Sequence, residues 1–145
     1  MNSVQVAFTL LLSFTFLVLG LVHFNWVVGG KWGWDAALPT KENGKRVLNP
    51  RKIDSFIVGV GLVVFGLFYL VRGGLVGVSS IPAWIFEYGS WIIPIIFLLR
   101  AVGDFTYVGF FKKIKKTKFG EWDTRLFAPL CLAIAVAGLV LVVFY

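Results

Sequence analysis

The chain has 145 residues, of which 59% are hydrophobic and 14% are charged, and its mean hydropathy is +0.88. A water-soluble domain has about 45–50% apolar and about 25% charged residues, so this composition argues against a soluble enzyme, a disordered tail and a secreted disulfide scaffold. Cys131 is the only cysteine, which excludes an intrachain disulfide and a cysteine-based zinc site. We interpret the net charge of +7 as a sign of membrane topology, and we expect no nucleic-acid partner.

Four apolar segments are each close to the ~20 residues that cross ~30 Å of hydrocarbon as a helix. None shows the alternation that is typical of a membrane β-strand. The first has no Lys or Arg before it and no small-residue cleavage site after it, so we interpret it as a retained helix rather than a signal peptide. We predict an all-α integral membrane four-helix bundle that forms a single transmembrane domain over residues 1–145. The predicted spans are residues 4–28, 55–71, 82–111 and 126–145.

Positive charges are concentrated in two of the connecting segments. Six Lys or Arg residues lie between the first two spans and six between the last two, whereas the opposite side has only Arg72. Because basic loops stay on the cytoplasmic side, this bias of twelve to one predicts two basic cytoplasmic loops with both termini outside. We therefore expect a multi-pass protein of the plasma (inner) membrane.

The third span cannot avoid holding a charge. Only twelve uncharged residues separate Glu87 from Arg100, which is about 18 Å of helix and too short to cross the bilayer. A helix that continues to Phe111 places Arg100 and Asp104 at membrane depth, where an ionisable group costs ~2.5–3.5 kcal/mol. These two residues are four apart and opposite in charge, so we predict an intrahelical ion pair with Tyr107 on the same face.

Two interpretations of this pair stay open. The pair can serve a function, since ionisable residues inside membranes are functional candidates, or it can fix helix packing while Arg100 extends toward the cytoplasmic headgroups. Glu87 is expected at the opposite interface, near Tyr88 and Trp91, and Pro94 is expected to kink the helix.

Small and polar residues mark the helix faces that should meet inside the bundle. In the second span Gly59, Gly66 and Gly73 recur at sevenfold spacing, which predicts close approach of another helix. In the first span one sector is polar and is predicted to face the bundle; its members are Gln5, Thr9, Ser13, Gly20 and His23.

His23 lies near the cytoplasmic end of the first span, followed by Asn25 and Trp26. As the only histidine it cannot form a two-histidine metal site within one chain. We interpret it as a hydrogen-bonded anchor, and a proton-handling role is the less favoured alternative.

Both basic loops are expected to contact lipid. Loop 29–51 contains Trp32 and Trp34, and because tryptophan belongs at the membrane interface, part of this loop is predicted to cover the cytoplasmic end as a lid. The other run should meet anionic headgroups at about 1 kcal/mol per charge; its lysines are Lys112, Lys113, Lys115, Lys116 and Lys118. No phosphate loop, nucleophile elbow, paired catalytic carboxylates or metal motif is found, so no cofactor or metal is expected and catalysis stays undecided.

The stretch from Arg100 to Lys113 reads Arg-Ala-Val-Gly-Asp-Phe-Thr-Tyr-Val-Gly-Phe-Phe-Lys-Lys. It resembles the signature of a family of small bacterial membrane proteins of unknown function, and residues 23–26, 30–33, 37–39 and 124–130 add to the resemblance. The resemblance implies a bacterial four-helix inner-membrane protein. It supplies no activity, substrate or cofactor.

Our first functional hypothesis is a polar pocket, open to the cytoplasmic leaflet, that binds a lipid or other amphiphile with an anionic end. Arg100 would meet the anionic group, Asp104 would hold Arg100 or exchange a proton, and the loop of Trp32 and Trp34 would cover the site. The predicted ligand-binding residues are His23, Asn25, Trp26, Arg100, Asp104 and Tyr107.

Three alternatives stay open. The first is an oligomeric small transporter or proton-coupled carrier, which requires a homo-oligomer. The second is a membrane enzyme that acts on a lipid or quinone with Asp104 or His23 as general base. The third is a structural or regulatory subunit that docks a partner membrane protein through its glycine face.

Overall fold

The computed structural model describes residues 2–145 and is helical in this range, apart from its loops and turns. Four of its helices are long and apolar enough to cross a membrane, which confirms the prediction of an all-α multi-pass membrane protein. The helices are α1 (Ser3–Val27), α2 (Trp34–Ala37), α3 (Lys52–Arg72), α4 (Ala83–Val102), α5 (Lys118–Trp122), the π-helix η1 (Asp123–Phe127) and α6 (Ala128–Phe144).

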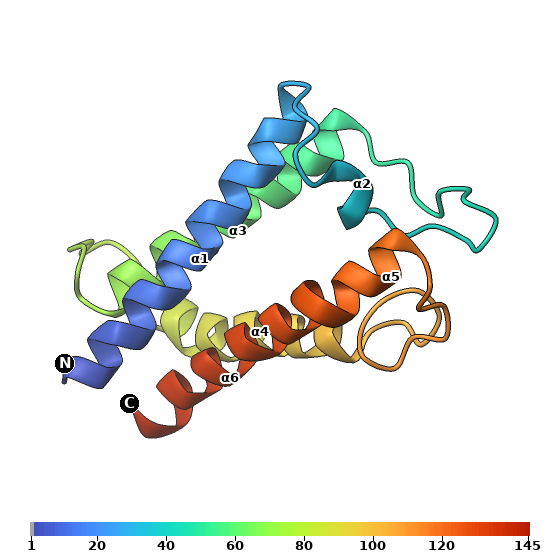
Figure 1. Cartoon of the computed structure of the whole chain (residues 1–145). Helices are drawn as coiled ribbons and strands as arrows, with labels where there is room; N and C mark the ends of the chain where they lie inside the picture. Colours follow the sequence, from blue (N-terminus) through green and yellow to red (C-terminus); the bar gives the residue numbers. More distant parts are fainter. Residues whose placement is uncertain (1) are drawn as a thin grey trace.

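The spanning helices form two hairpins that are arranged as a V (Figure 1). One hairpin pairs α1 with α3, and the other pairs α4 with α6. The hairpins meet near the two termini, where α1 contacts α6, and they diverge toward the opposite end, where α2 packs against α5.

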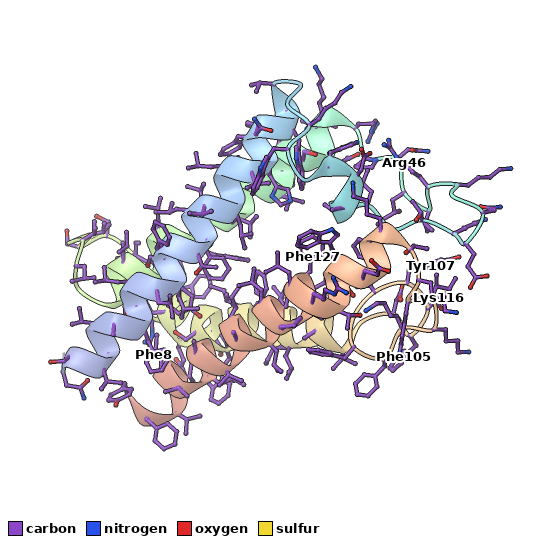
Figure 2. The ribbon with its side chains drawn as sticks, viewed as in Figure 1. Phe8, Arg46, Phe105, Tyr107, Lys116 and Phe127 are labelled. Atoms are coloured by element: carbon purple, nitrogen blue, oxygen red, sulfur yellow. The ribbon has the colours of Figure 1, made fainter. Side chains whose placement is uncertain are left out.

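The two basic loops lie at the same end of the molecule, away from the termini (Figure 1). We call the end that carries residues 28–51 and 103–117 the basic end, and the end that carries both termini the terminal end. Figure 2 shows Arg46, Tyr107 and Lys116 at the basic end and Phe8 near the termini. The segregation of charge that the sequence predicts is therefore present in the fold.

The α1–α3 hairpin is built on small residues. A Cβ atom added at Gly20 would lie 2.8 Å from Val63 and 3.2 Å from the carbonyl oxygen of Gly59, and one added at Gly66 would lie 3.2 Å from the carbonyl oxygen of Ser13. Because lipid tails are as apolar as leucine, helix association in a membrane depends on this kind of close approach. The predicted glycine face of α3 and the polar sector of α1 meet each other, with Thr9, Ser13 and Gly20 buried.

Aromatic side chains join the two hairpins in the terminal half of the molecule. Phe16 of α1 is fully buried and stacks on Tyr69 of α3 with ring centroids 6.0 Å apart. Phe16 also packs at 5.2 Å against Phe97 of α4. Arg72, at the end of α3, adds a hydrogen bond of 3.2 Å from Nη2 to the carbonyl oxygen of Leu141 in α6.

Two predicted span boundaries differ from the structure. The third helix ends at Val102 and not at Phe111, because Gly103 adopts φ 88° and ψ −167° and turns the chain out of the helix. The fourth begins at Lys118 rather than at residue 126, since α5, η1 and α6 run on as one apolar helix.

Candidate functional site

Three charged side chains from different segments meet where α4 and the fourth span approach the basic end. Asp123 Oδ1 accepts a hydrogen bond of 2.8 Å from Arg100 Nη2, and Asp123 Oδ2 lies 3.1 Å from Lys112 Nζ. The side chains of Lys112 and Asp123 are fully buried, and that of Arg100 is 33% exposed. We call these three residues the ion cluster.

The π-helix η1 contains Asp123 at its first position. Pro129 follows in the second position of α6, and a proline has no N–H and its ring clashes with the carbonyl four residues earlier, here that of Arg125. The helix here forms the wider hydrogen bonds of a π-helix instead: the N–H of Ala128 donates to the carbonyl of Asp123, five residues back. Such π-turns are frequent at functional sites.

The loop after α4 is fixed by two glycines. Gly103 (φ 88°) and Gly109 (φ 87°) both adopt left-handed conformations, which glycine occupies at little cost. Their backbones pack so closely that a Cβ on either glycine would overlap backbone atoms of the other glycine or of the residue before it. This contact presents the N–H of Gly109 to Asp123 Oδ2 at 2.7 Å and its carbonyl to Lys112 Nζ at 2.9 Å.

Asp104 folds the same loop from outside. Its Oδ1 accepts three backbone hydrogen bonds, from Thr106 at 2.9 Å, Tyr107 at 2.7 Å and Val108 at 2.9 Å. Partial desolvation alone would raise the pKa of this carboxyl, but the backbone hydrogen bonds from Val108, Thr106 and Tyr107 outweigh it and lower the pKa. Asp104 is therefore a charged organiser of an exposed turn.

The predicted pair of Arg100 with Asp104 was wrong. The i, i+4 argument requires a continuous helix, and α4 ends at Val102, between the two residues. Arg100 pairs with Asp123 instead. The prediction that Lys112 meets lipid headgroups was also wrong, because its ammonium is buried among Asp123, the carbonyl of Gly109 and the hydroxyl of Thr124.

The ion cluster is built as a connector. It joins the end of α4, the loop and the start of the fourth span, and its two cations exceed its one carboxylate by one positive charge. Arg100 Nη1 is buried and has no hydrogen-bond partner within residues 2–145. The residues that distinguish the stretch 100–113, including Arg100, Gly103, Gly109 and Lys112, thus hold this connection together.

A different set of residues forms a pocket at the basic end of the α1–α3 hairpin. Trp26 and Trp34 pack edge to face with centroids 5.3 Å apart, and Trp26 Nε1 donates a hydrogen bond of 2.7 Å to the carbonyl of Trp32. The loop that follows α1 is thereby folded back over the end of its helix. This arrangement borders an open pocket of about 500 Å³ that we call the tryptophan pocket.

Charged groups surround the tryptophan pocket. Arg46 and Asp35 line it and form an ion pair of 2.9 Å, whereas its other two cations, Lys31 and Lys52, have no ion-pair partner in the described part of the chain. Ser55 also lines the pocket and is 5% exposed. No side-chain hydrogen bond within residues 2–145 comes from its hydroxyl, and the hydroxyl oxygen is not among the buried side-chain atoms that lack a partner, so it keeps accessible surface that a ligand can contact.

The structure divides the six predicted ligand-binding residues between the two hairpins. His23, Asn25 and Trp26 belong to α1, and only Trp26 lines the tryptophan pocket. No hydrogen bond or ion pair of the described residues joins this group to Arg100, Asp104 or Tyr107.

The individual environments of these residues are distinct. His23 Nδ1 lies 2.8 Å from the carbonyl oxygen of Leu19 within its own helix, and its ring packs at 4.7 Å from that of Trp26. Asn25 is exposed, and Tyr107 is half-buried in the loop after α4. Of the predicted lipid-facing lysines, all but Lys112 are exposed; these are Lys113, Lys115, Lys116 and Lys118.

Sequence reasoning missed Asp123 and most of the tryptophan pocket. Asp123 and Glu121 are the two acidic residues of the otherwise basic segment 112–125. An acidic residue among so many cations was the available signal for an ion pair. For the pocket, the signal was the pair of opposite charges Asp35 and Arg46 in a loop with two tryptophans. Within the described range, no group of three His, Cys, Asp or Glu residues is arranged to hold a metal ion.

A family model described as "Protein of unknown function (DUF3995)" matches residues 16–138 of the chain. No curated protein and no solved structure matches the chain. The matched range includes the ion cluster, the loop between α4 and α5, and the tryptophan pocket.

Proposed function

The chain belongs to this family, described as Protein of unknown function (DUF3995), and from its geometry we propose that it binds an anionic amphiphile in the tryptophan pocket. One observation carries the proposal: indole rings, a serine hydroxyl and two lysines without an ion-pair partner among residues 2–145 line one pocket at the end of a membrane-spanning hairpin. Sites of this kind suit molecules that have an apolar body and one polar end.

The lining supplies a role for each part of such a ligand. The rings of Trp26 and Trp34 offer apolar surface to the body of the ligand. Lys31 and Lys52 carry charges that attract a carboxylate or phosphate, and the hydroxyl of Ser55 can donate a hydrogen bond to the same group. The ion pair of Asp35 with Arg46 links two segments of the pocket wall.

We further propose that the basic end faces the cytoplasm of a plasma membrane, with both termini outside, because loops rich in Lys and Arg are retained on the cytoplasmic side. Trp26 and Trp34 then lie near the headgroup level, where tryptophan is enriched. An amphiphile of the inner leaflet would reach the pocket with its tail still in the bilayer. The expected partners are therefore membrane lipids or related molecules with anionic headgroups.

The test compares ligands that share a tail and differ in charge. Protein extracted gently from membranes is examined by native mass spectrometry for a retained small molecule, and is then titrated with oleate and with uncharged monoolein. We expect oleate to bind about tenfold more tightly than monoolein, because each neutralised cation near the headgroup is worth about 1 kcal/mol.

The pocket variant Lys31→Gln/Lys52→Gln should lose this preference. The matched control Lys45→Gln/Lys113→Gln removes the same charge from exposed lysines that do not line the tryptophan pocket and should keep it. The proposal fails if oleate and monoolein bind the wild type equally, or if both double variants respond alike.

A further inference from the structure

A second pocket, of about 540 Å³, lies between the two basic loops. One wall comes from the loop of the first hairpin, with Thr40, Lys41, Glu42 and Gly44, and the other from residues 116–118 at the start of α5. We call it the interloop pocket. It shares no lining residue with the tryptophan pocket and is therefore a separate candidate binding site.

Both walls of the interloop pocket are fixed by hydrogen bonds. On one side the turn of residues 41–45 is closed by bonds from Lys41 N to Lys45 O at 2.8 Å and from Gly44 N to Lys41 O at 2.9 Å. On the other side the hydroxyl of Thr117 caps α5 by accepting the N–H of Gly120 at 3.0 Å. The backbone of both walls is therefore held at set positions before any ligand arrives.

The lining carries an excess of positive charge. Lys41, Lys116 and Lys118 contribute three ammonium groups, against one carboxylate from Glu42. None of these four residues forms an ion pair in the part of the chain that the structure describes. Like charges from segments that are distant in sequence repel each other, so an anion between them would relieve that repulsion.

We propose that the interloop pocket holds the phosphate group of an anionic phospholipid and that this phosphate clamps the two hairpins together at the basic end. The hydroxyl of Thr40 lines the same pocket and can complete the hydrogen bonds of a phosphate. A lipid source fits the location, because Lys116 and Lys118 lie at the start of the fourth span, and lysines at such a position are within reach of the headgroups of the adjacent leaflet.

A clamp at this position has a mechanical meaning. The hairpins share an aromatic core in their terminal half, but at the basic end they diverge and touch through α2 and α5 (Figure 1). A phosphate bound by Lys41 from one hairpin and by Lys116 and Lys118 from the other would tie the open ends of the V. The proposal does not depend on the tryptophan pocket being occupied.

Binding is tested with the full chain in detergent micelles, by native mass spectrometry during titration with phosphatidylglycerol or phosphatidylcholine. We expect phosphatidylglycerol to bind more tightly, and Lys116→Gln/Lys118→Gln to weaken its binding about tenfold. Lys113→Gln/Lys115→Gln removes the same charge from exposed lysines of the same segment outside the pocket and should change binding by about twofold or less. Lys41→Gln, in the other loop, should weaken binding as a second and independent variant.

The outcomes separate the sources of the anion. Equal losses in the two double variants would overturn the pocket in favour of general attraction between the basic end and lipid. In another outcome, inorganic phosphate at millimolar concentration displaces phosphatidylglycerol and stabilises the protein as much as the lipid does. That result would overturn the lipid source and indicate a soluble phosphate ligand.

The clamp itself is tested by measuring the distance between the two hairpins. In a Cys131→Ser background, spin labels are attached at the exposed positions Ile57 and Leu126, one in each hairpin. Phosphatidylglycerol should narrow the distance distribution in the wild type and leave that of Lys116→Gln/Lys118→Gln unchanged. Tight binding without any narrowing would overturn the clamp.

Discussion

Asp123 stabilises three parts of the chain through one carboxylate. Its two oxygens contact Arg100 from α4, Lys112 from the loop and the N–H of Gly109. Two of these partners are cations that are wholly or partly withdrawn from water, and each would be costly without a counter-charge. The single carboxylate is what allows Lys112 to be buried, and Arg100 to be partly buried, beside a spanning helix.

Replacing Asp123 by Asn should destabilise the protein by about 3–5 kcal/mol, because Arg100 and Lys112 would lose the one counter-charge that they have among residues 2–145. Unfolding in detergent by a graded denaturant measures this free energy. Asp35→Asn breaks an exposed ion pair and should cost about 0–1 kcal/mol.

Adding Lys112→Met to Asp123→Asn should recover part of the loss, since one uncompensated charge is removed. The two changes would then be non-additive, as expected for contacting residues. Additive costs would contradict the ion cluster.

Asp104 gives the loop a dependence on pH. Its pKa is lowered from 3.8 in the folded protein, so its contribution to stability is complete above pH 3.8 and is lost as pH falls through the lower folded pKa. The amide proton signals of Thr106, Tyr107 and Val108 should shift together with a midpoint below 3.8. The amide of Lys45 donates to the uncharged Oδ1 of Asn43 and should show no such step.

The partner of Arg100 could not be read from local spacing. The sequence does require a charge in the third span, and Arg100 does lie in the last turn of α4. Its partner, however, is 23 residues away, and pairing over that distance depends on how the loop returns. Gly103 and Gly109, seen in sequence as parts of a motif, decide that path through their left-handed conformations.

The α1–α3 hairpin is the element whose packing the sequence predicted best. Sevenfold glycine spacing and a polar sector both report a periodic helix face, and periodicity survives whatever the rest of the fold does. The turn η1 was not predictable in the same way. Pro129 shows where a helix must deform, but it does not say whether the helix will break, kink or take in an extra residue.

Gly66→Val should destabilise the hairpin by about 1–3 kcal/mol, because the added side chain would collide with Leu17 and with the backbone of Ser13. Gly61 lies on the same helix, and a Cβ there would meet nothing within 4 Å. Gly61→Val is thus the matched control and should leave the unfolding free energy nearly unchanged. Similar losses in both variants would mean that helix propensity, not packing, sets the cost.

The whole molecule is held by a small core of aromatic and aliphatic side chains between two hairpins. Composition predicts the number of spans and charge predicts that both basic loops share one end, and the fold has both features. The V-shaped arrangement of the hairpins could not be predicted, because it depends on which interior side chains touch. Phe16 of α1, for example, has contacts in α3 and α4 that no pattern in its own helix reveals.

Phe16→Ala should destabilise the protein by about 1–2 kcal/mol in detergent or lipid. This is less than the ~3–5 kcal/mol of a soluble core, since the lost contacts are van der Waals contacts without a transfer from water. Phe14 lies on the same helix with 68% of its surface exposed, and Phe14→Ala should cost little. Equal effects on thermal stability would place the junction of the hairpins elsewhere.

The proposed orientation predicts which loops a membrane-impermeant thiol reagent reaches in intact cells. In a Cys131→Ser background, Ser79→Cys in the turn between α3 and α4 should react from outside, whereas Asn43→Cys in the first basic loop should react only after the membrane is opened. The reverse pattern would place the basic end outside.

The divergence of the hairpins has a consequence for the surrounding bilayer. A V-shaped protein occupies more lateral area in the leaflet at its open end than in the leaflet at its closed end (Figure 1). Lipids must compensate for that difference in area. The compensation they have to make is smallest where the membrane bends so that the leaflet at the basic end is stretched. Closing the open end would reduce the imbalance, so the shape of the protein and the local curvature of its membrane are mechanically coupled.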